Sequence, residues 1–155
     1  MTEQFKWTEE LSVGVGALDR DHQWLLQLAE SVGPQVDVDL SARDERVNTL
    51  LADFLAHTTD HFSREEWLME ACEYPGLDKH RDTHRSVKKQ ILAFVNASKQ
   101  GCSDDDLGRF RVFAKNWILD HILYHDQSYV AWMQDRAEVV ERANLDFDRQ
   151  VRDEE

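Results

Sequence analysis

The sequence predicts an all-α protein: an up-down-up-down antiparallel four-helix bundle with an N-terminal arm and a helical C-terminal extension. Four long segments place apolar residues at alternating steps of three and four, the period of an amphipathic helix. Strand-like alternation is scarce, and only six glycines and two prolines punctuate the 155 residues. Because short connections between long helices favour antiparallel neighbours, these segments should form a bundle.

The first two helices end at helix-breaking residues. Residues 18–32 carry the first apolar stripe, which stops at Gly33-Pro34. Residues 47–72 carry the second stripe, for which Ser41 is the expected N-cap and Pro75-Gly76 the stop.

The third and fourth helices complete the bundle. The third stripe covers residues 77–98 and ends at Gly101, and the fourth begins after Ser103 and reaches His121. Asp106 follows Ser103 by three residues, so the two should form a capping box that uses Asp in place of Glu.

The residues outside these stripes divide the chain in two. Residues 1–17 are expected to form an irregular arm, which belongs with the bundle in one domain of residues 1–132. Residues 133–155 are compatible with a helix but highly charged, so we expect an appended helix or tail there. A length of 155 residues matches one globular domain of the usual ~100–200 residues.

Charge and composition exclude several function classes. Acidic residues number 31 and basic residues 18, and a formal net charge of −13 repels nucleic acid and anionic lipid. The chain has no apolar run of transmembrane length, and its first ten residues do not resemble a secretory signal. Cys72 and Cys102 form no CxxC motif and should lie at opposite ends of the bundle. We therefore expect a cytoplasmic protein without membrane insertion or a nucleic-acid partner.

The chemistry begins on the helix stripes that should be apolar. Five histidines and one glutamate lie on them, and all four helices contribute: His22, His61, Glu65, His80, His84 and His121. A buried imidazole or carboxylate is costly unless it is paired, hydrogen-bonded or bound to metal. One such histidine is most often a satisfied core residue, but a shared cation accounts for all six groups together.

The spacing of these residues favours a metal site. His61 with Glu65, and His80 with His84, are i,i+4 pairs that place two ligands on one helix face. Imidazole and carboxylate suit iron, zinc, copper or manganese, and so large a donor set suits two metals better than one. Ferritin-like di-iron proteins repeat Glu-x-x-His on two helices. Only Asp19-x-x-His22 approaches that motif here, which argues against an oxygenase or ferroxidase of that kind.

From Trp7 to about Trp132 the chain resembles the hemerythrins, especially the single-domain bacterial ones. The matching motifs are Val13-Gly14-Val15, Leu18-Asp19-x-x-His22, His61-Phe62-x-x-Glu65-Glu66-x-x-Met69, Tyr74-Pro75, His80-x3-His84 and His121-Ile122-x3-Asp126. All seven ligand positions of the family carry the expected residue type. The stretch between the first two helices and the tail after Trp132 are long for this family.

The resemblance implies reversible O2 binding at a non-haem di-iron centre, by a carrier rather than an enzyme. One iron would be held by His80, His84 and His121, and the other by His22 and His61. Glu65 and Asp126 would bridge the irons, with an oxo or hydroxo group as a third bridge. The iron with two histidines would have the open position for O2. Since two electrons and one proton move onto O2 together, the buried centre keeps its net charge, and the two states stay close in energy.

Apolar residues within four positions of the ligands should wall the O2 pocket. They are Leu25, Phe62, Trp117, Ile118 and Ile122. The same residues should pack in the core, where they would exclude water and slow autoxidation.

Two histidines remain to be weighed against the ligand set. His125 stands four residues after His121 and Asp126 five, so ideal helix geometry favours His125 as the ligand. The resemblance and the need for a second bridging carboxylate favour Asp126, which is reachable if a single wide turn loosens the helix there. We expect Asp126 to be the ligand, His125 to lie at the rim, and His57 to lie at the edge of the core.

The expected function is O2 storage, delivery or buffering. The alternative is a signalling module that senses O2, nitric oxide or redox state, with the tail after Trp132 as its output. A peroxide- or nitric-oxide-consuming enzyme would need an open route for protons, which the apolar wall argues against. The sequence does not indicate a protein partner.

Overall fold

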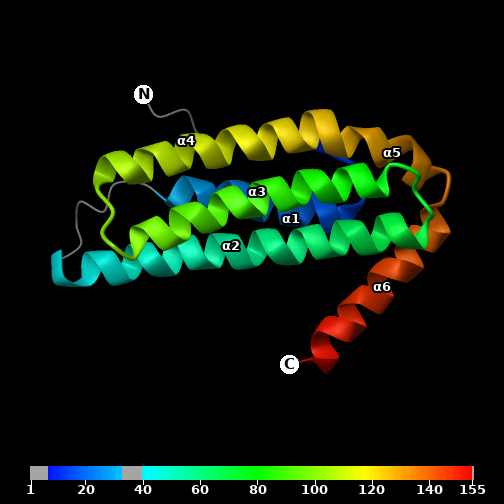
Figure 1. The fold of residues 1–155 in the computed structure, drawn as a ribbon. Helices are drawn as coiled ribbons and strands as arrows, with labels where there is room; N and C mark the ends of the chain where they lie inside the picture. The colour runs from blue at the N-terminus through cyan, green and yellow to red at the C-terminus, as the bar shows by residue number, and fades with distance from the viewer. Residues whose placement is uncertain (1–6, 33–39, 155) are drawn as a thin grey trace.

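The computed structural model describes residues 7–32 and 40–154 (Figure 1). Every regular element there is helical and no strand occurs in these two ranges, so the predicted all-α class is confirmed. The elements are η1 (Glu9–Leu11), α1 (Gly16–Ser31), α2 (Leu40–Ala71), α3 (Leu77–Ser98), α4 (Asp104–Asp120), η2 (His121–Asp126), α5 (Gln127–Gln134) and α6 (Ala137–Asp153). Helices α1 to α4 pack lengthwise, α2 against α1 and α3, and α1 against α4. Among the described helices, none is long and apolar enough to cross a membrane.

One carboxylate fixes the N-terminal arm to the start of α1. Asp19 accepts hydrogen bonds from the backbone N–H of Val13 (2.9 Å) and from the hydroxyl of Ser12 (2.6 Å). Helix α1 begins at Gly16, slightly before the predicted end of the arm at residue 17. The predicted stop of this helix, Gly33-Pro34, lies outside the described residues.

Helix α2 begins earlier than predicted and ends before the predicted stop. It starts at Leu40, so Ser41 lies inside its first turn and the prediction that Ser41 caps the helix is wrong. Residues 42–46, which the prediction already placed inside the helix, are mostly good helix formers although they add little to its apolar stripe. The chain then turns at Pro75-Gly76, where a Cβ on Gly76 would lie 2.7 Å from the ring of Tyr74. Glycine lets this turn close against the ring.

The fourth helix begins as predicted but does not end at His121. The Ser103 hydroxyl accepts a hydrogen bond from the Asp106 N–H (3.1 Å), and the Asp106 carboxylate accepts one from the Ser103 N–H (3.0 Å). After α4 the backbone widens into a π-helical turn, η2, and continues as α5. The N–H of Gln127 donates to the carbonyl of Ile122, five residues back.

The C-terminal segment is a helix that packs on the outside of the bundle. The chain bends at residues 135–136, and α6 then crosses α2 at an angle (Figure 1). Val140 and Ala143 of α6 are buried, and the indole N–H of Trp67 donates to the Ala143 carbonyl (2.9 Å). Of the two forms expected for the C-terminal segment, the structure shows a helix, over Ala137–Asp153.

The two free cysteines lie at opposite ends of α3, as predicted. The carbonyl of Cys72, just after α2, accepts a hydrogen bond from the indole of Trp132 (2.8 Å). The carbonyl of Cys102, just before α4, accepts one from Arg43. These contacts join the turns to neighbouring helices at both ends of the bundle.

Candidate metal centre

All seven predicted ligands are buried, and the structure brings them together. They come from α1 (His22), α2 (His61, Glu65), α3 (His80, His84) and η2 (His121, Asp126), and none is more than 5% exposed. Their ligand atoms form two groups, within each of which the atoms lie within 4.8 Å of one another. One group is Glu65, His80, His84 and His121; the other is His22, His61, Glu65 and Asp126. Glu65 belongs to both.

Glu65 lies between the two groups of histidines. Its Oε2 is 3.0 Å from Nε2 of His84 and 3.3 Å from Nε2 of His121. The same oxygen is 3.5 Å from Nε2 of His61, on the other side of the centre. Its Oε1 accepts a hydrogen bond from the Tyr129 hydroxyl (2.7 Å). A carboxylate in this position can serve two neighbouring cations at once.

Asp126 also reaches both groups. Its Oδ1 is 2.9 Å from Nε2 of His121 and 3.1 Å from Nε2 of His80. Its Oδ2 is 3.0 Å from Nε2 of His22. The preceding residue, His125, is exposed, and its ring centroid is 5.7 Å from that of His121. The π-helical turn brings the residue at i+5 from His121, rather than i+4, into the centre.

Many of these buried polar atoms have close neighbours but no hydrogen bond. Among the described residues, the unpartnered atoms of the centre are His22 Nδ1 and Nε2, His61 Nε2, His80 Nε2, His121 Nδ1, and both carboxylate oxygens of Asp126. The 3.0 Å pair of His22 and Asp126, for example, lacks hydrogen-bond geometry. Unsatisfied buried groups cost roughly 1–3 kcal/mol each. Crowded ligand atoms of which so many lack a hydrogen bond fit a shared cation, and imidazole with carboxylate fits iron.

Two further carboxylates orient the histidines from behind. Nδ1 of His61 lies 3.0 Å from Oδ2 of Asp21, and Nδ1 of His84 lies 3.1 Å from Oε1 of Glu66. Because a carboxylate accepts, each Nδ1–H donates, and Nε2 of each ring is left to face the centre.

Sequence reasoning missed Asp21, Glu66 and Tyr129 as parts of the site. Asp21 and Glu66 each adjoin a predicted ligand in the sequence, but each contacts a histidine of a different helix. The helical period shows which residues share a face of one helix, but it does not predict contacts between two helices. Tyr129 stands three residues after Asp126, and that inward position was the available signal for its contact with the centre.

The carboxylates and imidazoles shift one another's pKa values. Burial opposes charge on both histidines, but Asp126 and Glu65 outweigh it and raise the pKa of His80 to about 9 and that of His121 to about 10. Burial also opposes ionisation of Glu65, yet the surrounding histidines hold its pKa well below the usual range. The pKa of Asp126 is lowered in the same way, despite burial and the nearby Glu65. Metal binding to such a centre must displace protons.

The five predicted wall residues are buried. The ring of Phe62 stacks on His84, with centroids 3.8 Å apart, and lies 5.6 Å from the ring of Trp117. Trp117 in turn lies 5.8 Å from His121. These rings cover the imidazoles with apolar surface, and their role as an O2 pocket stays a prediction. His57, by contrast, is exposed and its ring lies 5.8 Å from that of Trp24.

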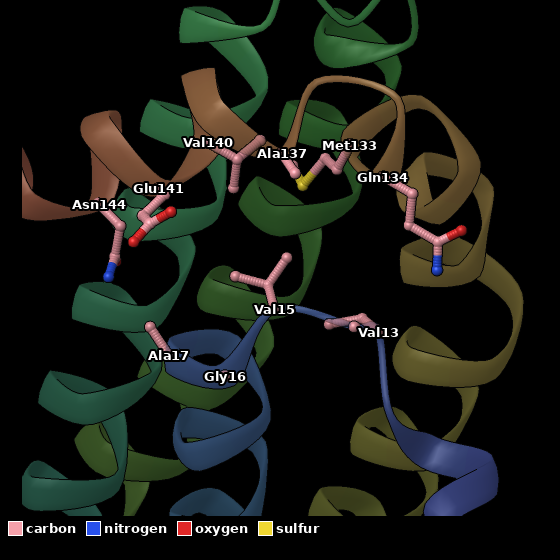
Figure 2. Close-up of a pocket in the computed structure, with 11 residues that line it drawn as sticks. Val13, Val15, Gly16, Ala17, Met133, Gln134, Ala137, Val140, Glu141 and Asn144 are labelled. Atoms are coloured by element: carbon pink, nitrogen blue, oxygen red, sulfur yellow. The ribbon is translucent and has the colours of Figure 1, made fainter.

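Three cavities differ in whether a predicted ligand is among their lining residues. A cavity of about 310 Å³ lies between the arm and α6, where Val15 and Ala17 face Ala137 and Val140 (Figure 2). None of the predicted ligands lines it. A cavity of about 200 Å³ includes His61 in its wall, and one of about 170 Å³ includes His80.

A helical protein whose core holds two histidine–carboxylate clusters that share a glutamate is, by its architecture, a metal-binding bundle. The chain belongs to the hemerythrin family, because the family model for the hemerythrin HHE cation binding domain matches residues 13–133.

Curated relatives agree with this assignment. A bacteriohemerythrin from Ralstonia nicotianae is 31% identical over 135 residues, which cover 84% of this chain and 90% of the relative. A myohemerythrin from Riftia pachyptila is 26% identical over 126 residues, which cover 81% and 90%. Myohemerythrin-1 from Phascolopsis gouldii is 25% identical over 127 residues, which cover 82% and 92%.

Proposed function

We propose that this protein binds O2 reversibly at a non-haem di-iron centre, for storage, delivery or buffering. Residues 1–132 would form the di-iron bundle, with α1 to α4 in up-down-up-down order, and residues 133–155 an appended segment. The observation that carries the proposal is the pair of clusters that share Glu65, in a chain of the hemerythrin family.

The donor set supports an unequal pair of metal positions. His80, His84 and His121 would hold one iron, His22 and His61 the other, and Glu65 and Asp126 would bridge them. The irons would supply the electrons that O2 accepts and the position at which it binds. Because one iron has two histidines rather than three, it is the one with room for an external ligand.

The surrounding residues favour a carrier over an enzyme. Phe62 and Trp117 pack against His84 and His121, and this apolar cover would limit the access of water to them. The Tyr129 hydroxyl contacts Glu65, but burial first, and then the nearby carboxylates, raise its pKa well above the usual range. Tyr129 therefore holds its proton and orients Glu65, rather than serving as an acid.

Metal analysis tests the composition of the centre. Protein from iron-replete cells should contain about two irons per chain, because the two clusters supply two sets of ligands. His84→Ala should lose iron from the three-histidine position and destabilise the bundle, since the remaining buried donors would lack their cation. One zinc per chain and no iron would contradict the proposal.

A further inference from the structure

Helix α6 covers the bundle unevenly. It packs on α2, where Trp67 and Phe147 lie with ring centroids 6.0 Å apart. On the side that faces α1, cavities lie beneath it instead. The one in Figure 2 separates its first turns from the arm and the start of α1, and a second lies beneath its last turns. The helix thus packs on α2 along one edge and borders two cavities along the other.

The second cavity, of about 200 Å³, leads toward the two-histidine position. Its inner wall includes His61 and Leu25, both at most 2% exposed. Its α6 wall consists of Phe147 and Val151. Leu25 is also one of the residues expected to wall the O2 pocket, so the cavity and the proposed pocket share this side chain. Without α6, this cavity would be an open groove between α1 and α2.

Arg64 connects α6 to the predicted metal ligand His61 through Asp21. Its Nη1 donates to Oδ1 of Asn144 (2.6 Å) and of Asp148 (2.8 Å) on α6. Its guanidinium lies 4.7 Å from the ring centroid of Phe147. On the other side, its Nε is 3.3 Å from Oδ2 of Asp21, the oxygen that pairs with His61. The Arg64 side chain therefore contacts both α6 and Asp21, the carboxylate that pairs with Nδ1 of His61.

From this arrangement we propose that the cavity beneath α6 is the access route for small ligands to the metal position held by His22 and His61. Phe147 closes the route, and Arg64 keeps α6 closed through Asp148. The inference rests on the proposed di-iron function, and it adds the route by which small ligands reach the iron and the helix that closes this route. Opening requires a backbone rotation at residues 135–136, where α6 leaves α5, and the loss of the Arg64 bonds to Asn144 and Asp148.

Azide binding to the oxidised, iron-loaded protein tests the route, and amide hydrogen exchange of α6 tests the gate. Asp148→Ala removes a charge-assisted partner of Arg64, so α6 amides should exchange about fivefold faster. The azide association rate should rise by a similar factor. Phe147→Ala should raise the association rate by widening the route. A gate changes association and dissociation alike, so the azide dissociation constant should remain the same.

Two matched variants serve as controls. Asp146→Ala makes the same change as Asp148→Ala, and Leu145→Ala likewise truncates an apolar side chain, both at exposed positions of α6, so neither should alter the exchange or association rate. If the unaltered iron protein binds neither azide nor O2, the proposed function fails, and this proposal with it. If it binds azide with equal rates in Asp148→Ala and Asp146→Ala, or if only the dissociation constant changes, the gate alone is overturned.

Discussion

Asp126 reaches the centre because the backbone widens between His121 and Gln127. In an ideal α-helix the residue four after His121 would share its face, and that residue is His125. The π-helical turn shifts the register by one residue, so that Asp126 is buried and His125 is exposed. The resemblance and the need for a second bridging carboxylate pointed to Asp126, whereas the ideal helical period pointed to His125.

Replacing these two residues should therefore have opposite results. Asp126→Ala removes a carboxylate that approaches histidines of both clusters, so it should lower the iron content and turn reversible oxygenation into rapid oxidation. His125→Ala should leave iron content and the oxygenated spectrum nearly unchanged. Metal analysis and visible absorption of both variants check this, and iron lost only from His125→Ala would refute the assignment.

Tyr129 offers a second test at the scale of single residues. Its hydroxyl donates to Glu65 in a fully buried setting, so Tyr129→Phe should lower the free energy of unfolding by about 1–2 kcal/mol. Tyr124→Phe is the matched control, because Tyr124 is 75% exposed. Urea unfolding of both variants measures the difference. Equal stabilities would mean that the Tyr129 contact does not stabilise the fold.

The helices themselves were mostly predictable, because burial imposes the helical period on the sequence. Residues 77–98 were predicted as the third helix and match α3. The start of α2 was predicted two residues too late, because Ser41 is a residue type that commonly caps helices and no apolar stripe marks residues 41–46. The bend at residues 135–136 was missed because no glycine or proline marks it.

The capping box of α4 gives a prediction at the scale of the element. Ser103→Ala removes the acceptor of the Asp106 N–H, so it should lower the free energy of unfolding by about 1 kcal/mol. Ser86→Ala, at an exposed position inside α3, should be neutral or slightly stabilising because alanine has the higher helix propensity. Thermal and urea unfolding compare the two, and an equal loss in both would count against the cap.

At the scale of the molecule, the site was more predictable than its surroundings. Six of the seven proposed ligands could be picked out because polar side chains interrupt stripes that must be buried, and the resemblance to the family added Asp126. Contacts across the bundle, such as that of Asp21 with His61, depend on how the helices pack against one another. The helical period of a single sequence does not predict which residues of two helices meet. The same holds for the bond between Arg64 and Asp148.

The charge balance of the centre predicts how stability depends on pH without metal. The raised pKa values of His80 and His121 mean that their protonated forms stabilise the fold. This stabilisation is fully present below their unfolded pKa of about 6.5 and is lost as the pH rises through about 9 and about 10. Chelator-treated protein should therefore lose unfolding free energy between pH 7 and pH 10.

Iron-loaded protein should not show that loss, because the metal replaces the protons. Urea unfolding of both samples at pH 7, 8.5 and 10 makes the comparison. A metal-free protein whose stability is flat over this range would contradict the ion pairing of the two histidines with Glu65 and Asp126.

The central claim is reversible O2 binding, and one measurement tests it most directly. Anaerobically reduced, iron-loaded protein is exposed to O2 and then purged with argon while its visible absorption is recorded. The covered, charge-balanced centre predicts an absorption band that appears with O2, disappears on purging and returns on re-exposure. Immediate and permanent oxidation to the ferric protein, with release of peroxide at every pH, would contradict the account.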